Sequence, residues 1–109
     1  MAVILNAPAV YRFTASAAPE RHLEGAECLG AEVRGATPAD AGEVVARRII
    51  DMMQATRFPQ GLTAVGYGEA DLGALAEGAF PQKRLLDNSP RAVSKEELAE
   101  LFRGAMRYW

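Results

Sequence analysis

The chain has 109 residues, of which 50% are hydrophobic and 24% charged, and its formal net charge is −2 at pH 7. This is the size of a single folded domain, and the mixed charges give no electrostatic reason to expect nucleic acid or an anionic membrane as a partner. No stretch reaches the roughly 20 apolar residues of a membrane-spanning helix, and the single cysteine excludes an internal disulfide and indicates a reducing compartment.

The hydrophobic pattern predicts an all-α fold of about five helices that form part of a helical bundle domain. The first predicted helix spans Ala2–Thr14, is apolar nearly all round and contains Pro8, which is expected to kink it. Helices without a polar face usually lie among other helices. We therefore expect a core helix, and Arg12 within it argues against a secretory signal sequence.

The second predicted helix begins at Pro19, a residue suited to the first helical turn, and ends at Gly30, which can adopt the left-handed closing conformation. Its inner stripe is expected to comprise Leu23, Ala26 and Leu29. Cys28 lies beside this stripe, so we predict a buried structural thiol, with a reactive thiol as the alternative.

The third predicted helix begins at Thr37, whose side chain can cap free backbone N–H groups, and Asp40 reinforces this cap. The helix runs to about Thr56 and has a wide apolar face that includes Met52 and Met53. We interpret the two methionines as core filling, with an adaptable binding groove as the alternative.

Shorter helices follow. A helical turn is predicted over residues 62–65, and a helix over about residues 69–80, in which Gly73 and Gly78 each cost about 1 kcal/mol relative to alanine. Residues 81–93 are rich in turn-forming residues and are predicted to form an irregular link. A capping box then opens the last helix, whose apolar stripe comprises Leu98, Leu101, Phe102, Ala105 and Met106.

The residues offer no catalytic constellation. His22 is the only histidine, so neither a serine nucleophile with a nearby histidine base nor a multi-histidine metal site is indicated. Helix capping and solvation explain the carboxylates that share a helical spacing. We interpret the pairs Arg47-Arg48 and Lys83-Arg84 as solvated helix edges, with a phosphate site as the alternative. The chain is therefore predicted to contain no catalytic residue, no cofactor-binding residue and no metal ligand.

Three stretches carry a family resemblance: PAVYRFTASAAPERHLEGAECLG, GLTAVGYGEADLGALAEGAFPQKR and SKEELAELFRGAMRYW. They resemble the C-terminal helical region of the iron-dependent (group III) alcohol dehydrogenases, and within that family the hydroxyacid-oxoacid transhydrogenase branch. The similarity extends over residues 1–109 with nearly unchanged spacing. So long a match is far more specific than a short motif.

The resemblance implies that this chain is one part of a longer protein whose other parts bind the cofactor and the metal. Family members bind NAD(P) in an N-terminal α/β domain and hold a divalent metal, iron or zinc, with one Asp and three His in a helical domain. The last His lies in a His-Gly pair just before the helix that begins MAVILNAPAV here. Residues 1–109 are thus expected to be the C-terminal part of the helical metal-binding domain, without the nucleotide domain and the ligand-bearing helices. Because family members bury this first helix beside the metal, we expect it to be partly uncovered in this chain.

The resemblance also points to one loop. Matching the Pro90-Arg91 pair with the family places Leu85 and Leu86 on the substrate side of the cleft. Leucines can shape such a pocket but cannot transfer protons or bind metal. The alternative is a surface loop whose two leucines are tucked into the core.

Two functional hypotheses follow. In the first, the chain is the C-terminal fragment of a metal- and nicotinamide-dependent oxidoreductase, an alcohol or 2-hydroxy acid dehydrogenase or transhydrogenase, in which it walls the active-site cleft and is inactive alone. In the transhydrogenase branch a hydride passes between a hydroxy acid such as 4-hydroxybutyrate and a 2-oxo acid. In the second, the chain is a free-standing helical module that forms a homo-oligomer through its apolar first helix or complements a larger chain. The expected location is the cytoplasm, or the mitochondrion for a eukaryotic protein.

Overall fold

The computed structural model describes residues 2–109, which form six α-helices and four short 3-10 helices and include no strand. The α-helices are α1 (Ala2–Thr14), α2 (Pro19–Cys28), α3 (Ala41–Ala55), α4 (Leu72–Ala79), α5 (Lys83–Leu86) and α6 (Lys95–Gly104). The 3-10 helices are η1 (Ala15–Ala17), η2 (Pro38–Asp40), η3 (Leu62–Val65) and η4 (Glu69–Asp71). The predicted all-α class is confirmed.

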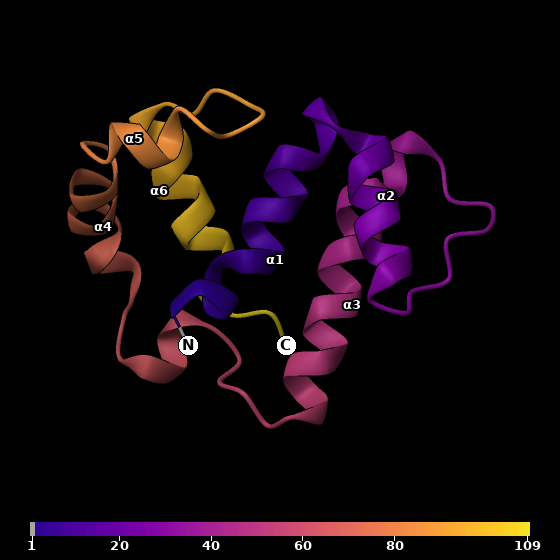
Figure 1. Ribbon diagram of the computed structural model, residues 1–109. Helices are drawn as coiled ribbons and strands as arrows, with labels where there is room; N and C mark the ends of the chain where they lie inside the picture. Colours follow the sequence, from indigo (N-terminus) through magenta and orange to yellow (C-terminus); the bar gives the residue numbers. More distant parts are fainter. Residues whose placement is uncertain (1) are drawn as a thin grey trace.

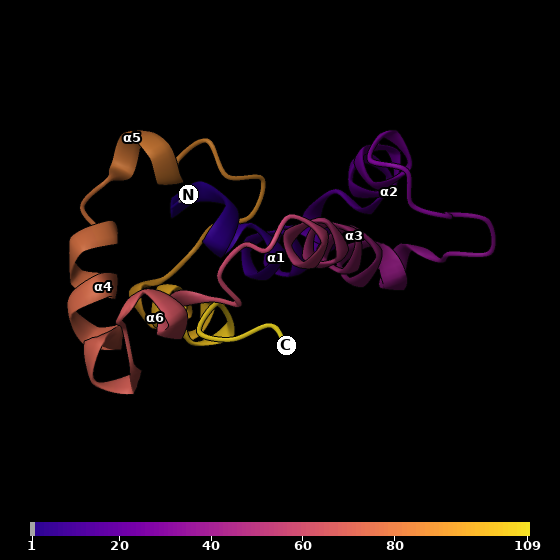
Figure 2. The same ribbon diagram turned by 90° about the horizontal axis from the view of Figure 1, so that it is seen from below.

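Helix α1 lies at the centre of the molecule, where it contacts α3 on one side and α6 on the other (Figure 1). Because α2 packs against α3 and α4 packs against α6, α1 joins two pairs of helices. The principal extents are 40 × 31 × 19 Å, and the shortest corresponds to about two helix diameters. In Figure 2, α1, α3 and α6 lie close to one layer, with α2 and α5 above it. The molecule is therefore flat, and few of its helices are covered on all sides.

The core lies where α1, α3 and α6 meet. α1 contributes Leu5 and Ala9, and α3 contributes the side chains that face it at helical spacing, Val45, Ile49 and Met53. Met53 is only 1% exposed, which confirms the prediction that this methionine fills the core. Gly42 allows α3 to approach α1 closely, because a Cβ at this position would lie 3.1 Å from the Arg12 Cα.

The prediction for the inner face of α2 was partly wrong. Ala26 is fully buried and Leu23 half-buried, but Leu29 is 40% exposed and Cys28 is exposed. Residues two positions apart on a helix point in nearly opposite directions, so burial of Ala26 directs Cys28 toward solvent. α2 ends at Cys28, so Leu29 lies just beyond its last turn, and the chain then turns at Gly30 with a φ of +93°.

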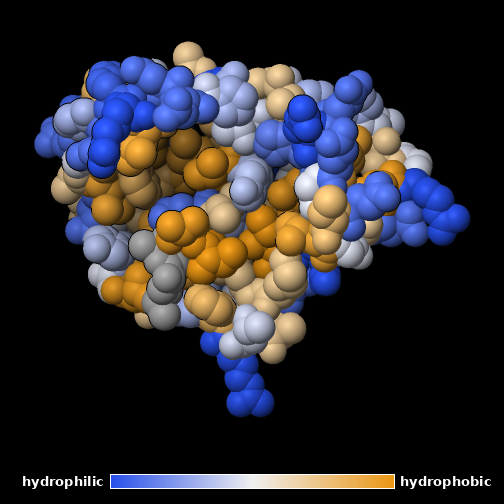
Figure 3. Space-filling model, viewed as in Figure 1, coloured by the Kyte–Doolittle hydropathy of each residue, from blue (hydrophilic) through white to orange (hydrophobic). Residues whose placement is uncertain are grey.

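The first helix is partly uncovered, as expected. Leu5, Pro8 and Ala9 are buried, whereas Val3 is 85% exposed and Val10 is 38% exposed. Pro8 lies inside α1, and Figure 1 shows the first turns, in indigo, running at an angle to the rest of the helix. Apolar residues gather around these first turns in the middle of the face seen in Figure 3.

The link over residues 81–93 is less irregular than predicted. It contains α5, a single helical turn in which the Leu86 amide donates to the Gln82 carbonyl and the Asp87 amide to the Lys83 carbonyl. The Asn88 side chain donates to the Arg84 carbonyl at 3.0 Å and satisfies one of the free acceptors at the end of the turn. One turn is too short to produce a helical hydrophobic period, which is why the pattern did not reveal it.

Two predicted caps are confirmed. At α6, the Glu97 amide donates to Ser94 Oγ at 3.1 Å and the Ser94 amide donates to Glu97 Oε1 at 3.0 Å, which completes a capping box. The Ser94 amide, with further help from the Arg91 charge, lowers the pKa of Glu97 below its ordinary value. Before α3, the Thr37 amide donates to the Asp40 carboxylate at 2.9 Å. These contacts fix where α6 begins and close the 3-10 turn η2, which leads into α3 at Ala41.

The C-terminal tail, defined as residues 105–109, runs beside the segment before and within η3. The Leu62 amide donates to the Ala105 carbonyl at 2.9 Å, the Thr63 amide to the Met106 carbonyl at 3.0 Å, and the Tyr108 amide to the Gln60 carbonyl at 2.8 Å. Gly61 lies where the two segments cross, with a φ of +152°. A Cβ at this position would overlap the Met106 carbonyl, so the crossing requires glycine.

Replacement of this glycine tests the importance of the crossing. We expect Gly61→Ala to lower the free energy of unfolding by at least about 2 kcal/mol, because it adds steric overlap to backbone strain. Gly78→Ala is the matched control: nothing lies within 4 Å of its added Cβ, and α4 should gain about 0.5 to 1 kcal/mol from the better helix former. Urea denaturation followed by circular dichroism measures both values. Equal effects of the two substitutions would contradict the role given to the crossing.

Candidate functional site

An apolar recess lies beside the first turns of α1. Its volume is about 330 Å³, and it is lined by Leu5, Asn6, Leu62, Val65, Tyr67, Leu75 and Phe102. These residues come from α1, from η3 and the turn after it, from α4 and from α6. The recess is thus built at the place where the two halves of the chain meet.

The local sequence explains why the recess has this shape. Gly66 adopts a φ of +103° and closes η3, and the Tyr67 amide then donates to the Leu62 carbonyl at 3.1 Å. This turn leaves Val65 40% exposed and Tyr67 43% exposed at the edge of the recess. Apolar walls of this kind can hold an apolar group and exclude water, but they supply no acid or base for proton transfer near neutral pH.

Leu85 and Leu86 lie in α5, at the edge of the molecule next to α4 (Figures 1 and 2). Leu85 is 60% exposed and Leu86 is half-buried, so the alternative that both are tucked into the core is wrong for Leu85. Neither residue lines the recess beside α1. Their predicted position on the substrate side of a cleft stays a prediction.

Arg91 follows the α5 link and connects three elements. Its Nη1 donates to the Phe13 carbonyl at the end of α1 at 3.1 Å, and its Nη2 donates to Glu97 Oε2 in α6 at 3.2 Å. The guanidinium carbon lies 3.9 Å from the centre of the Phe13 ring, which is a cation–π distance. A planar group with several donors is needed for these simultaneous contacts. Arg91 therefore holds the end of the link in place.

The depression next to Arg91, about 340 Å³ in volume, is lined by residues of α1 and α6. Arg12, also in its wall, pairs with Glu43 of α3 at 2.9 Å. The Arg12 guanidinium is the main cause of a lowered pKa at the Glu43 carboxyl. Since Arg12 and Arg91 are each matched by a carboxylate, the depression has no strong net attraction for an anion.

His22 has a structural role in joining α1 to α2. Its Nδ1 lies 2.7 Å from the Ala18 carbonyl and its Nε2 lies 2.8 Å from the Thr14 hydroxyl. A carbonyl can only accept, so Nδ1 carries a proton and donates. Both ring nitrogens are therefore engaged. Across the described residues, no group of three or more His, Cys, Asp or Glu side chains could hold a metal ion.

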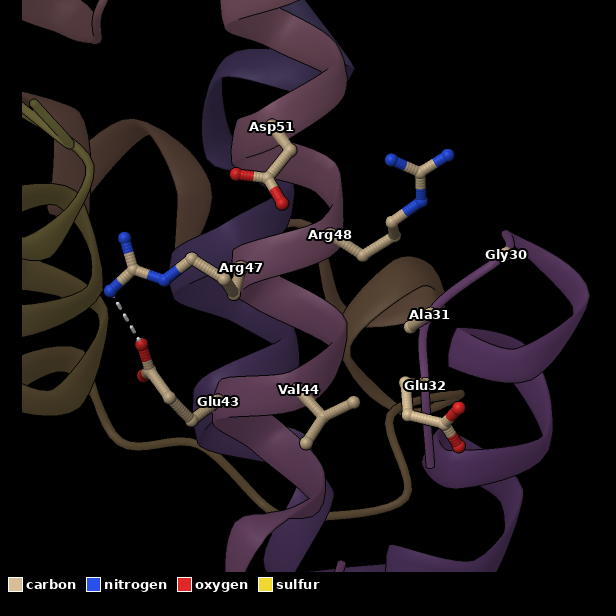
Figure 4. A pocket seen from close by; sticks show the side chains of 8 residues that line it. All are labelled: Gly30, Ala31, Glu32, Glu43, Val44, Arg47, Arg48 and Asp51. Atoms are coloured by element: carbon tan, nitrogen blue, oxygen red, sulfur yellow. Dashed lines mark hydrogen bonds and ion pairs between the residues drawn. The ribbon is translucent and has the colours of Figure 1, made fainter. Parts of the chain in front are cut away.

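A groove between α3 and the segment after α2 has a volume of about 490 Å³ and is shown in Figure 4. Arg47 donates to Glu43 at 3.1 Å, and Arg48 Nε donates to the Leu29 carbonyl at 2.6 Å. Glu32 and Asp51 add negative charge to the same groove (Figure 4). For the pair Arg47-Arg48, these contacts support a solvated helix edge, as predicted, rather than a phosphate site.

The comparisons with known proteins agree over nearly the whole chain. Residues 1–106 match the family described as Fe-containing alcohol dehydrogenase family, C-terminal. The chain belongs to this family. The hydroxyacid-oxoacid transhydrogenase, mitochondrial, of Xenopus tropicalis is 45% identical over 109 residues, which are 100% of this chain and 24% of that protein. The Homo sapiens protein of the same name is 44% identical, again over 100% of this chain and 23% of that protein. The resemblance inferred from the sequence is confirmed.

The fold comparison supports the same assignment. A solved structure described as 1,3-propanediol oxidoreductase superposes with a TM-score of 0.84 and 29% sequence identity, over 94% of this chain and 27% of that one. The chain spans about a quarter of the length of the curated relatives it matches. None of the helices described here is long and apolar enough to cross a membrane.

The family name specifies iron, and the described residues do not form a site that fits it. The nitrogens of the sole histidine are hydrogen-bonded, and the carboxylates do not gather into a metal-binding group in the part of the chain that the structure describes. Neutral imidazole nitrogens and clustered carboxylates are the usual protein ligands for such an ion.

Substitution of Arg91 tests whether it holds the link. We expect Arg91→Lys to lower the free energy of unfolding by about 1 kcal/mol, because an ammonium cannot reach the Phe13 carbonyl and Glu97 together. Arg34→Lys is the matched control, since the Arg34 side chain is 90% exposed and pairs with Glu32 on the surface. Its effect should stay below about 0.5 kcal/mol. Chemical denaturation of the two variants measures the difference, and equal losses would show that Arg91 is an ordinary surface residue.

Proposed function

We propose that this chain is the C-terminal helical part of a metal- and nicotinamide-dependent oxidoreductase and forms one wall of its active-site cleft. The similarity to hydroxyacid-oxoacid transhydrogenases along the entire chain carries this proposal. The whole protein would transfer a hydride from an alcohol or 2-hydroxy acid, and in a transhydrogenase would deliver it to a 2-oxo acid. Metal and NAD(P) would be held by residues outside this chain.

In this proposal the chain contributes shape rather than reactive groups. The uncovered first turns of α1 and the apolar recess beside them provide a water-excluding wall. Leu85, 60% exposed here, would be covered on the substrate side of the cleft, with Leu86 behind it. Relatives named as mitochondrial make the mitochondrion the proposed location for a eukaryotic protein, and the cytoplasm is proposed for a bacterial one.

The exposed apolar side of α1 favours an additional proposal about partners. Val3 is 85% exposed, Val10 38% and Tyr11 41%, and their spacing places them along one side of the helix. We propose that the rest of the longer protein covers this side, and that a second copy of the chain covers it when the chain is alone. Burial of apolar surface supplies the free energy in both cases.

Metal content and activity test the main proposal. We expect the purified chain to bind no stoichiometric iron or zinc in elemental analysis, and to reduce no NAD(P) with alcohols or 2-hydroxy acids. Tight metal binding would place ligands within the chain and contradict the proposal. A His22→Ala variant would then show whether the sole histidine is one of them.

Light scattering tests the proposal about partners. Replacing both Val3 and Val10 with Glu should shift the isolated chain from oligomer to monomer, because two charges would then be buried in the contact. Gln54→Glu, which adds a charge to an exposed position of α3, is the matched control and should leave the mass unchanged. An oligomer that survives the double substitution would show that a different surface drives association.

A further inference from the structure

The hydroxyl of Tyr108 lies within the hydrogen-bond ladder of α1. It donates to the Leu5 carbonyl at 2.7 Å and accepts from the Ala9 amide at 3.4 Å. In an uninterrupted α-helix these two backbone groups, four residues apart, bond directly to each other. A residue from the other end of the chain therefore bridges one rung of the central helix.

The bridged rung is next to the proline of α1. Pro8 has no N–H to donate to the Ile4 carbonyl, and its ring crowds that carbonyl, so the ladder is weakened at this point. Side chains inserted between successive turns are a recognised cause of helix bending. Pro8 is fully buried, with less than 2% of its surface exposed, so water does not easily fill the gap. The tyrosine hydroxyl reinforces the next rung, between Leu5 and Ala9, directly beside the carbonyl that Pro8 leaves without a donor.

The hydroxyl is suited to this role because it is held in position and keeps its proton. The Tyr108 amide donates to the Gln60 carbonyl at 2.8 Å, and the adjoining Met106 carbonyl accepts from both the amide and the hydroxyl of Thr63, at 3.0 and 2.8 Å. Desolvation of the half-buried ring raises the pKa of Tyr108 to about 12, so the group remains a donor near neutral pH.

We propose that Tyr108 is a positioning residue that sets the direction of the first two turns of α1 by bridging Leu5 and Ala9. Removal of the hydroxyl would free the Leu5 carbonyl and let these turns change direction relative to residues 9–14. Only the consequence for the active-site cleft rests on the proposed function.

Nuclear magnetic resonance of the isolated chain tests the bridge. In Tyr108→Phe, which keeps the ring, we expect the Ala9 amide to exchange with solvent about tenfold faster, as loss of one partly buried hydrogen bond predicts. Residual dipolar couplings should show residues 3–7 reoriented relative to residues 9–14. The amides of Ile50 and Met53 in α3 should exchange at nearly the wild-type rate. Tyr67→Phe, which removes an exposed hydroxyl, is the control and should change none of these values.

A second background tests the link to the proline. Pro8→Ala restores the donor to the Ile4 carbonyl and removes the crowding by the proline ring, so the neighbouring Leu5–Ala9 rung should depend less on the hydroxyl. Tyr108→Phe should then accelerate Ala9 exchange less than threefold in this background, rather than about tenfold. Unchanged Ala9 exchange and couplings in Tyr108→Phe would overturn the proposal, and so would an equal acceleration at Ala9 and Ile50. If Tyr108→Phe does not fold, folding of Pro8→Ala with Tyr108→Phe supports the bridge, and failure of both rejects it.

These outcomes are independent of metal content and activity. A chain that binds metal would contradict the proposed function and leave the Ala9 measurements unaffected. A failure of the bridge, in turn, would leave the family assignment and the oxidoreductase proposal standing.

Discussion

The crossing of the C-terminal tail over the segment that leads into η3 holds the two halves of this chain together. Gly61 lies directly against the Met106 carbonyl, and the tail pairs with the backbone on both sides of it. From this crossing Tyr108 reaches back to α1, while Ala105 and Met106 enter the core. At this crossing, backbone hydrogen bonds and the burial of apolar side chains both stabilise the contact between the two halves. Loss of either would release α6 and its neighbours from α1.

The flat shape of the molecule follows from how its apolar residues are distributed. α3 presents one apolar face to α1, and α6 presents one to α1 and α4, so each has a solvated side. α1 is apolar on more sides than its neighbours cover, and Val3 and Val10 remain exposed. A helix of this kind is stable when further elements pack on it. This is the arrangement expected of one part of a larger helical domain, and it agrees with a match to a quarter of each relative.

Much of the fold could be predicted from local patterns. Helix starts and apolar helix faces depend on residues only a few positions apart, so the sequence shows them directly. Examples are Pro19, the capping box at Ser94 and the apolar spacing of α3 and α6. The exposed Cys28 was mispredicted because its neighbour Leu29 was taken as part of the buried stripe, whereas burial of Ala26 directs Cys28 toward solvent. Arg91 and Phe13 are 78 positions apart in the sequence, and Tyr108 and Leu5 are 103 positions apart. No local sequence pattern predicts contacts between residues so distant. The family resemblance placed Leu85 and Leu86 on the substrate side of a cleft, which stays a prediction, but it could not indicate that they lie in a helical turn.

Reading the gene in frame immediately upstream of Met1 tests most directly whether these helices belong to a longer oxidoreductase. We expect codons for a His-Gly pair directly before Met1, within an open frame that continues to the remaining Asp and His ligands and to a glycine-rich nucleotide-binding turn. The helices described here would then adjoin its metal site, as proposed. A stop codon and a ribosome-binding site just before Met1 would contradict this and show a short protein that works by association.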